Sequence, residues 1–379
     1  MHLETFQYTA RNGWSTPLTS DLDSPDTLVL AFGSSGYKGA PGPLEEVDRA
    51  WPRAHMMGCS TAGEIFGAQV EDDSLSIAVA RFDGTEVATA FAPLDASQDL
   101  LEAGRSIARQ LYKPSLRGVL VLSDGQNVNG SELVRGLNET LPASVIVTGG
   151  LAGDGDRFGR TWVLKDRRPE HGFVSAVGFY GDRIRIGHGS QGGWDIFGPE
   201  REVTRAERNV LYELGGKPAL QLYKTYLGEQ AAGLPATALL FPLAVRVSMH
   251  DDKRVVRTVL SVDEERQSMT FAGDIPQGSF VQLMRANMDR LIEGASSAAL
   301  RARDNAITGP DTLSIAISCV GRRLVLGERV EEELEATLDA LPVGARQVGF
   351  YSYGEISPFG TGCCDLHNQT MTLTTLFEE

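Results

Sequence analysis

The sequence has 379 residues, of which 42% are hydrophobic and 22% charged, and its formal net charge is -15 at pH 7. This length is enough for two domains with well-buried cores. Because the chain is acidic and has no cluster of Lys and Arg, nucleic acid and anionic membranes are poor partners for it.

The N-terminal segment MHLETFQYTARNGW lacks a basic start followed by an apolar run. No stretch of the chain reaches the roughly 18 to 20 apolar residues of a membrane span. Two of the four cysteines, Cys363 and Cys364, are adjacent, which is an unfavourable framework for disulfides. We therefore expect a cytoplasmic protein with free thiols and no membrane insertion.

Three segments of the chain repeat one pattern, an apolar run, a helix-period stretch and a second apolar run that ends in glycine and an acid. They run from TLVLAF to MMGCSTAGE, from GVLVLS to VIVTGGLAGD and from TLSIAIS to QVGFYSYGE. Aligned on their ends, they make Glu64, Asp154 and Glu355 equivalent. Each repeat predicts a strand, a helix and a second strand parallel to the first.

Strand-like pairs lie between the repeats. Asp83-Gly84 and Gly181-Asp182 predict hairpin turns within SLSIAVARFDGTEVATAFAPL and FVSAVGFYGDRIRIGHG. A third pair is RVVRTVLSV with QSMTFAG, and the long helical patterns are SQDLLEAGRSIARQL and GSFVQLMRANMDRLIEGASSAALRARD. The predicted fold is α/β, with mixed sheets built from repeated strand-helix-strand units and β-hairpins and covered by helices.

The chain is expected to divide at the Gly, Ala and Pro-rich loop GEQAAGLPAT, about residues 228–237. The predicted organisation is a lead-in at 1–26, a first domain at 27–230 and a second at 235–379.

The ends of the repeats are candidate ligand sites, because glycines beyond the carboxyl ends of strands let a ligand approach backbone amides. The alternative is structural, since a strand-to-turn corner also favours glycine, and an acid there can cap backbone amides. An enzyme would use Cys59 or Ser60 with a histidine and one of the acids. However, GCSTAG misses the spacing of a nucleophile elbow by one residue, and a small buried residue also explains Cys59.

His188 lies among glycines and before two aromatic residues, in RIGHGSQGGWDIFG. A histidine in such surroundings can approach a flat apolar cofactor such as haem and bind its iron. The alternative is a histidine that is hydrogen-bonded in a loop. In the tail, GTGCCDLHNQT places Cys363, Cys364 and His367 together, but adjacent cysteines are poorly arranged for zinc.

Seven segments resemble the motifs of FIST proteins, in the order of their N-terminal and C-terminal portions. They are MGCSTAGEI, SDGQNVNGSELVRGLN, GGLAGDG, YELGGKPALQLYKTYLG, FPLAVRV, GFYSYGEI and HNQTMTLT. The resemblance spans about residues 25 to 375. It implies two FIST-type domains and cytoplasmic sensing of a small ligand in bacterial signal transduction, with amino acids as proposed ligands of some members.

The chain most resembles the nitric-oxide-sensing haem proteins of that family, called NosP. This resemblance implies a haem cofactor with His188 as its axial iron ligand and His188, Gly189 and Trp194 as cofactor-binding residues. It further implies a two-component system in which the protein regulates a partner histidine kinase, and it leaves a homo-oligomer open.

We therefore expect a non-enzymatic sensor of nitric oxide through haem. The alternatives are a sensor of an amino acid or another small organic ligand, and a Cys- or Ser-dependent enzyme. The absorption of bound haem distinguishes the nitric oxide sensor from the other two, and catalytic turnover distinguishes the enzyme. The ligand-binding residues expected at the repeat ends are Cys59, Ser60, Thr61, Gly63, Glu64, Gly150, Gly153, Asp154, Tyr353, Glu355 and Asn368.

Overall fold

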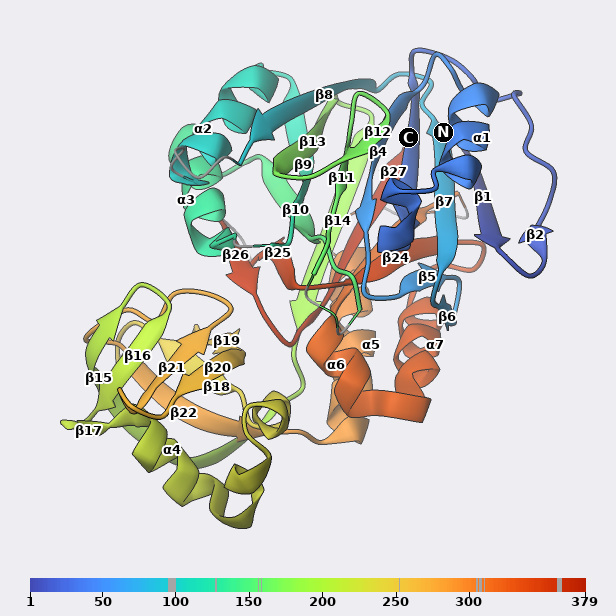
Figure 1. Cartoon of the computed structure of the whole chain (residues 1–379). Helices are drawn as coiled ribbons and strands as arrows, with labels where there is room; N and C mark the ends of the chain where they lie inside the picture. The colour runs from blue at the N-terminus through green and yellow to red at the C-terminus, as the bar shows by residue number, and fades with distance from the viewer. Residues whose placement is uncertain are drawn as a thin grey trace.

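The computed structural model describes residues 1–94, 100–126, 128–155, 157, 159–251, 253–304, 306, 309, 311–359 and 363–379. Figure 1 shows a larger part, here called the body, and a smaller part, the β-unit. The β-unit consists of residues 195–285, and the body contains the rest of the chain. No helix among these residues is long and apolar enough to cross a membrane.

The three sequence repeats form the centres of three sheets in the body. In each sheet the first two strands of the repeat are parallel, and a later strand pairs antiparallel with the first. The expected strand-helix-strand units are confirmed. The central strands are β3 (Thr27–Gly33), β4 (His55–Ser60) and β7 (Ser74–Arg81); β9 (Leu116–Ser123), β10 (Ile146–Leu151) and β13 (Phe173–Tyr180); and β23 (Leu313–Cys319), β24 (Arg346–Ser352) and β27 (Met371–Glu378).

Each repeat also extends into a short hairpin that joins the sheet of another repeat. The first hairpin pairs with β24, the second with β4 and the third with β10. This exchange ties the three sheets together. The hairpins are β5 (Glu64–Phe66) with β6 (Gln69–Glu71), β11 (Val163–Lys165) with β12 (Arg168–Glu170), and β25 (Gly354–Pro358) with β26 (Cys364–His367).

Edge strands and helices complete the body. The edge strands are β1 (His2–Thr9), β2 (Gly13–Trp14), β8 (Glu86–Pro93) and β14 (Ile184–Gln191). The helices are η1 (Ser35–Lys38), α1 (Gly42–Ala50), α2 (Leu100–Leu111), α3 (Gly130–Thr140), α5 (Met288–Asp304), α6 (Val320–Leu326), η4 (Gly327–Arg329) and α7 (Val330–Ala340). The expected start of α2 at Ser97 lies outside the described residues. The second expected helix is wrong at its start, because Phe280–Arg285 form the strand β22 and α5 begins at Met288.

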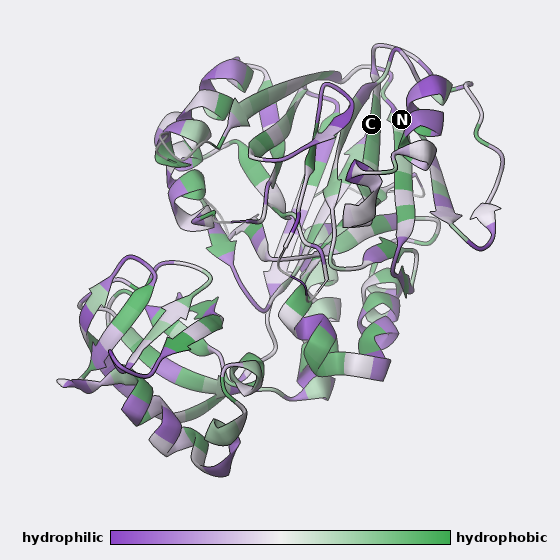
Figure 2. Cartoon of the chain, in the orientation of Figure 1, coloured by the Kyte–Doolittle hydropathy of each residue, from purple (hydrophilic) through white to green (hydrophobic). Residues whose placement is uncertain are grey.

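The apolar core of the body lies where the three sheets meet. Phe32 of the first sheet stacks on Phe350 of the third, with ring centroids 4.9 Å apart, and Leu120 and Val177 of the second sheet belong to the same cluster. Figure 2 shows hydrophobic residues along the central strands of the body. Their burial is the main source of stability for a fold of this kind.

Two of the three predicted hairpins are wrong. β7 pairs with β1 and β3, whereas β8 pairs with β13 in another sheet, so Asp83-Gly84 is a corner between sheets. β13 and β14 likewise lie in different sheets. The first corner is fixed by Glu378, whose carboxylate accepts hydrogen bonds from the backbone N–H groups of Asp83 and Gly84 at 2.7 and 2.8 Å. Burial alone would raise the pKa of Glu378, but these hydrogen bonds outweigh burial and lower the pKa to about 2.

The β-unit has its own sheet and core. Val203, Tyr223 and Phe271 are buried within it, and β20 and β21 form the third predicted hairpin, which is confirmed. The expected boundary loop forms η2 and η3 inside this unit. Its elements are β15 (Asp195–Glu207), β16 (Val210–Leu214), β17 (Lys217–Pro218), α4 (Ala219–Leu227), η2 (Gly228–Gly233), η3 (Ala236–Leu240), β18 (Leu243–Arg246), β19 (Val255–Arg257), β20 (Val259–Asp263), β21 (Ser268–Phe271) and β22 (Phe280–Arg285).

Polar contacts join the β-unit to the second sheet of the body. Asn129, the N-cap of α3, donates a hydrogen bond from Nδ2 to Asp274 Oδ1 at 2.8 Å. Arg257 Nη1 donates to the Leu366 carbonyl at 2.9 Å, and Lys253 forms an ion pair with Asp365. The seam between the two parts is therefore a specific interface.

Candidate functional site

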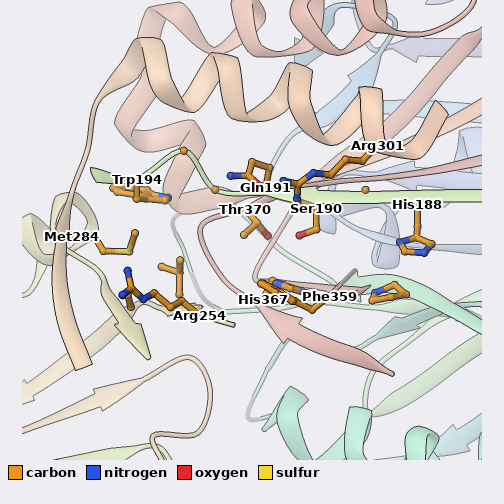
Figure 3. A pocket seen from close by; sticks show the side chains of 16 residues that line it. His188, Ser190, Gln191, Trp194, Arg254, Met284, Arg301, Phe359, His367 and Thr370 are labelled. Carbon is orange, nitrogen blue, oxygen red and sulfur yellow. The ribbon is translucent and has the colours of Figure 1, made fainter. Parts of the chain in front are cut away.

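A cavity of about 640 Å³ lies at the seam between the body and the β-unit (Figure 3). Cavities of about 300–1,000 Å³ are typical of small-molecule and cofactor sites. This one is lined by residues of both parts, namely His188, Gly189, Ser190, Gln191, Gly192, Gly193, Trp194, Ala244, Arg254, Val256, Met284, Arg301, Pro358, Phe359, His367 and Thr370.

His188 reaches the cavity from β14, which is backed by α5. A Cβ atom at Gly187 would lie 2.0 Å from the Ala302 carbonyl oxygen, and one at Gly189 would lie 1.9 Å from that of Ala298. Glycine at both positions therefore lets β14 pack directly on the helix. Because side chains alternate along a strand, His188 points away from α5. Burial lowers the pKa of His188, so its imidazole is neutral at pH 7.

His367 is a second imidazole in the same cavity. Its side chain is buried, its Nε2 lies 3.0 Å from the Ser357 carbonyl oxygen, and its ring stacks on Phe359 with an interplanar angle of 11°. Burial lowers the pKa of His367 to about 4, so it too is neutral at pH 7. Figure 3 shows the two histidines on different ribbons, with His188 projecting from β14.

Apolar and cationic side chains complete the lining. Trp194 is held in place by a 2.7 Å hydrogen bond from Nε1 to the Gln369 carbonyl oxygen. Met284 enters from β22 of the β-unit. Arg254 and Arg301 add positive charge, and Arg301 donates a 3.1 Å hydrogen bond to the Ser190 carbonyl oxygen. The cavity therefore presents imidazole, aromatic and guanidinium groups to a ligand.

The GCSTAGE segment lies elsewhere in the body. Cys59 is completely buried in the core shared by the three sheets, and burial raises the pKa of its thiol well above the usual value. Ser60 Oγ accepts a 2.9 Å hydrogen bond from the backbone N–H of Trp162. These surroundings suit packing, whereas a reactive thiol requires a lowered pKa and access.

Glu64 and Glu355 occupy equivalent positions in the first and third repeats. Glu64 Oε2 accepts hydrogen bonds from Ser74 N and Oγ at 2.9 and 3.0 Å, and Thr61 donates to its other oxygen. Glu355 accepts matching hydrogen bonds from Ser352 Oγ at 2.6 Å, Thr370 Oγ1 at 2.9 Å and Thr370 N at 3.3 Å. Burial raises the pKa of each carboxyl to about 8, although the hydrogen bonds oppose this shift. Both are therefore mainly neutral at pH 7.

In the second repeat the carboxyl that bonds to the start of the third strand belongs to Asp124, which follows β9, and the alignment of Asp154 with Glu64 and Glu355 is one residue out. Asp124 accepts hydrogen bonds from Thr161 Oγ1 and, at 2.6 Å, from the Gly172 N–H that precedes β13. Asp154 instead accepts from the backbone N–H groups of Gly159 and Arg160 at 2.8 and 2.7 Å. Gly153 N donates to the Ser60 carbonyl at 2.9 Å, as Ala62 N donates to the Tyr351 carbonyl at 2.8 Å, so Asp154 takes the place of Gly63 and not that of Glu64.

The structure brings together some of the predicted site residues and separates others. His188, Gly189 and Trp194 line the seam cavity. Thr61 and Glu64 line a second cavity of about 510 Å³, together with Arg157 and Arg323. Gly63 lies beside it, because a Cβ there would be 2.7 Å from Arg323 Nη1.

The remaining predicted residues lie in close packing around the corners. A Cβ at Gly150 would be 3.0 Å from Ile317, and one at Gly153 would be 2.8 Å from the backbone nitrogen of Ala62. Tyr353 donates a hydrogen bond from its hydroxyl to Asp154. Asn368 is buried, and its side-chain amide has no hydrogen-bond partner among the described residues. Ligand binding by these residues stays a prediction.

Sequence reasoning missed most of the seam cavity. Arg254, Met284, Arg301, Phe359 and Thr370 come from distant parts of the chain, and no local motif marks them. His367 was considered only as a zinc ligand with the adjacent cysteines. Cys364 is buried against Asn138, and the described residues contain no group of three or more His, Cys, Asp or Glu side chains that could hold a metal ion.

Comparison with known proteins identifies two sequence domains. The FIST N domain matches residues 27–217, and the FIST C domain matches residues 219–358. The chain is also similar to an uncharacterized protein of Methanocaldococcus jannaschii, with 27% identity over 255 residues. That similarity covers 59% of this chain and 46% of the archaeal protein, so the chain matches about half the length of this relative. The chain belongs to the FIST family, whose domains are associated with signal transduction and the sensing of small ligands.

Proposed function

We propose that this protein is a haem-based nitric oxide sensor of the NosP type, which binds its cofactor in the seam cavity and regulates a partner histidine kinase. The observation that carries this proposal is the composition of the cavity. It combines a neutral imidazole from His188 with the flat side chains of Trp194 and Phe359 and with two arginines.

The residues present fit haem. His188 would bind the iron, since a neutral imidazole is a common axial ligand. Trp194, Phe359 and Met284 would pack against the porphyrin, and Arg254 and Arg301 would pair with its propionates, because guanidinium groups bind carboxylates well. Haem would supply an iron that binds diatomic gases such as nitric oxide.

The location of the cavity connects binding to the rest of the protein. His188 lies on β14, and Gly192 and Gly193 lead directly from this strand into β15 of the β-unit. Arg322 donates a hydrogen bond to the Gly192 carbonyl and also pairs, fully buried, with Glu333 of α7. A displacement of His188 would therefore act on both the seam and the helices that pack on the third sheet.

A titration of the haem-free protein with ferric haem tests the proposal. We expect the wild type to bind one haem per chain and His188→Ala to bind at least about tenfold more weakly, with a changed absorption spectrum. His2→Ala is the control, because His2 lies on the edge strand β1 and does not line the cavity. If His188→Ala kept the stoichiometry, affinity and spectrum of the wild type, His188 would not be the iron ligand.

The second cavity supports another candidate function, the sensing of an amino acid or a similar small organic ligand. Arg157, Arg323, Asp72 and Asp73 all line it, and Arg323 forms an ion pair with Asp72 at 2.7 Å. A zwitterion would find partners for both of its charges there. Thermal-shift measurements with free amino acids test this candidate, which requires a stabilisation that Arg157→Ala weakens.

A further inference from the structure

We propose that His367 is the second iron-binding residue of the seam cavity, so that ferric haem carries one imidazole from β14 and one from β26. This inference rests on the haem proposal and adds a residue that the sequence motifs did not assign to the cofactor.

The position of the His367 ring is fixed. His367 pairs in register with Glu355 of β25, and its side chain is only 3% exposed. Nε2 bonds to the Ser357 carbonyl oxygen at 3.0 Å, while Phe359 stacks on the ring face. A ring held by a hydrogen bond and a stacked neighbour keeps one orientation, as metal-ligating histidines require.

The hydrogen bond also determines the tautomer. A carbonyl oxygen only accepts, so Nε2 carries the proton and Nδ1 carries a lone pair. No described residue donates a hydrogen bond to Nδ1, although the side chain lines the cavity. A ligand in the cavity can therefore bond to Nδ1.

The two histidines approach the cavity from different sheets. His188 belongs to β14 of the third sheet, and His367 belongs to β26 of the second. Two imidazoles on different walls of one cavity could bind the same iron, and a ferric haem held by both would be low-spin.

Electron paramagnetic resonance of the ferric haem complex tests the inference with His367→Gln. The Gln side-chain amide reaches the position of Nε2 and keeps a donor for the Ser357 carbonyl, but it has no lone pair at the position of Nδ1. We expect a low-spin signal from the wild type and a high-spin signal from His367→Gln, and added imidazole should restore the low-spin signal. His2→Ala should match the wild type.

The outcomes separate the two proposals. If the wild type binds haem and is high-spin, or if His367→Gln remains low-spin, His367 does not bind the iron while the haem proposal stands. If the wild type does not bind haem at all, both proposals fail. Circular dichroism of the haem-free variants checks that each is folded.

Discussion

Glu64 and Glu355 are acids that the fold keeps mainly protonated at neutral pH. Burial raises the pKa of each to about 8, from an ordinary value of 4.5. Each carboxyl has its hydrogen-bond partners within its own repeat and the strand that follows. They are therefore poorly suited to bind an ammonium group, and we assign them the role of fixing the strand-to-hairpin corners.

These two carboxyls make stability depend on pH. Between their unfolded and folded pKa values the folded protein holds more protons than the unfolded chain, so the free energy of unfolding falls as pH rises through this window. The fall approaches about 1.4 kcal/mol per pH unit for each group. We predict that Glu64→Gln and Glu355→Gln each flatten the decline between about pH 5 and pH 7.5, measured by urea unfolding.

Glu331→Gln is the control for this prediction, because Glu331 is exposed on α7. It should leave the pH profile as in the wild type. A wild-type stability that rises with pH across the same range would show that the two carboxyls are ionised in the folded protein.

At the scale of elements, β14 and α5 support His188, the proposed iron ligand. The helix presents Ala295, Ala298 and Ala302 as buried small side chains, and the strand presents Gly187 and Gly189. Small residues on both sides let the two backbones approach closely. Gly187 and Gly189 thus let β14 pack on α5, and His188 between them lines the cavity on the other face of the strand.

We predict that Gly189→Ala destabilises the protein by about 1–3 kcal/mol, because its Cβ would overlap the Ala298 carbonyl and force β14 away from α5. The same shift would displace His188 and weaken haem binding. Denaturant midpoints and haem titration measure the two effects.

Gly39→Ala is the matched control, since Gly39 has a φ of -91° and the nearest heavy atom to its added Cβ would be 3.8 Å away. It should change neither property. Equal effects of the two substitutions would contradict the close packing of β14 on α5.

At the scale of the whole molecule, the seam cavity requires both the body and the β-unit. Ala244, Val256 and Met284 come from the β-unit, whereas the histidines come from the body. A bound group therefore contacts both parts and stabilises their present arrangement, because binding to the folded state alone adds to its stability.

We predict that haem slows amide hydrogen exchange in β14, β18, β19 and β26, which surround the cavity, and leaves β1 and β2 unchanged. The same experiment on His188→Ala, at equal haem concentration, should show a smaller effect. Protection confined to α6 and β5, beside the second cavity, would place the ligand there instead.

Much of the fold could be predicted from local sequence patterns. The apolar runs of the three repeats became strands, and their shared pattern reflects one unit used three times. The Asp83-Gly84 turn was misassigned because the turn residues are the same for a hairpin and for a corner between sheets. What decides between them is Glu378, nearly 300 residues away, which holds the corner.

The candidate site was predictable only in part. His188 and Trp194 share a short glycine-rich stretch that indicated a cofactor site. His367, Arg254 and Met284 reach the same cavity only because the body and the β-unit come together there. Asp124 was overlooked because it follows the first strand of its repeat, whereas Glu64 and Glu355 follow the second.

The absorption spectrum of the protein purified from cells supplied with haem tests the central claim most directly. Our account predicts a Soret band at one haem per chain, which shifts when the reduced protein is exposed to nitric oxide. A colourless protein that stays haem-free on titration would contradict the haem sensor and favour an organic ligand in the second cavity.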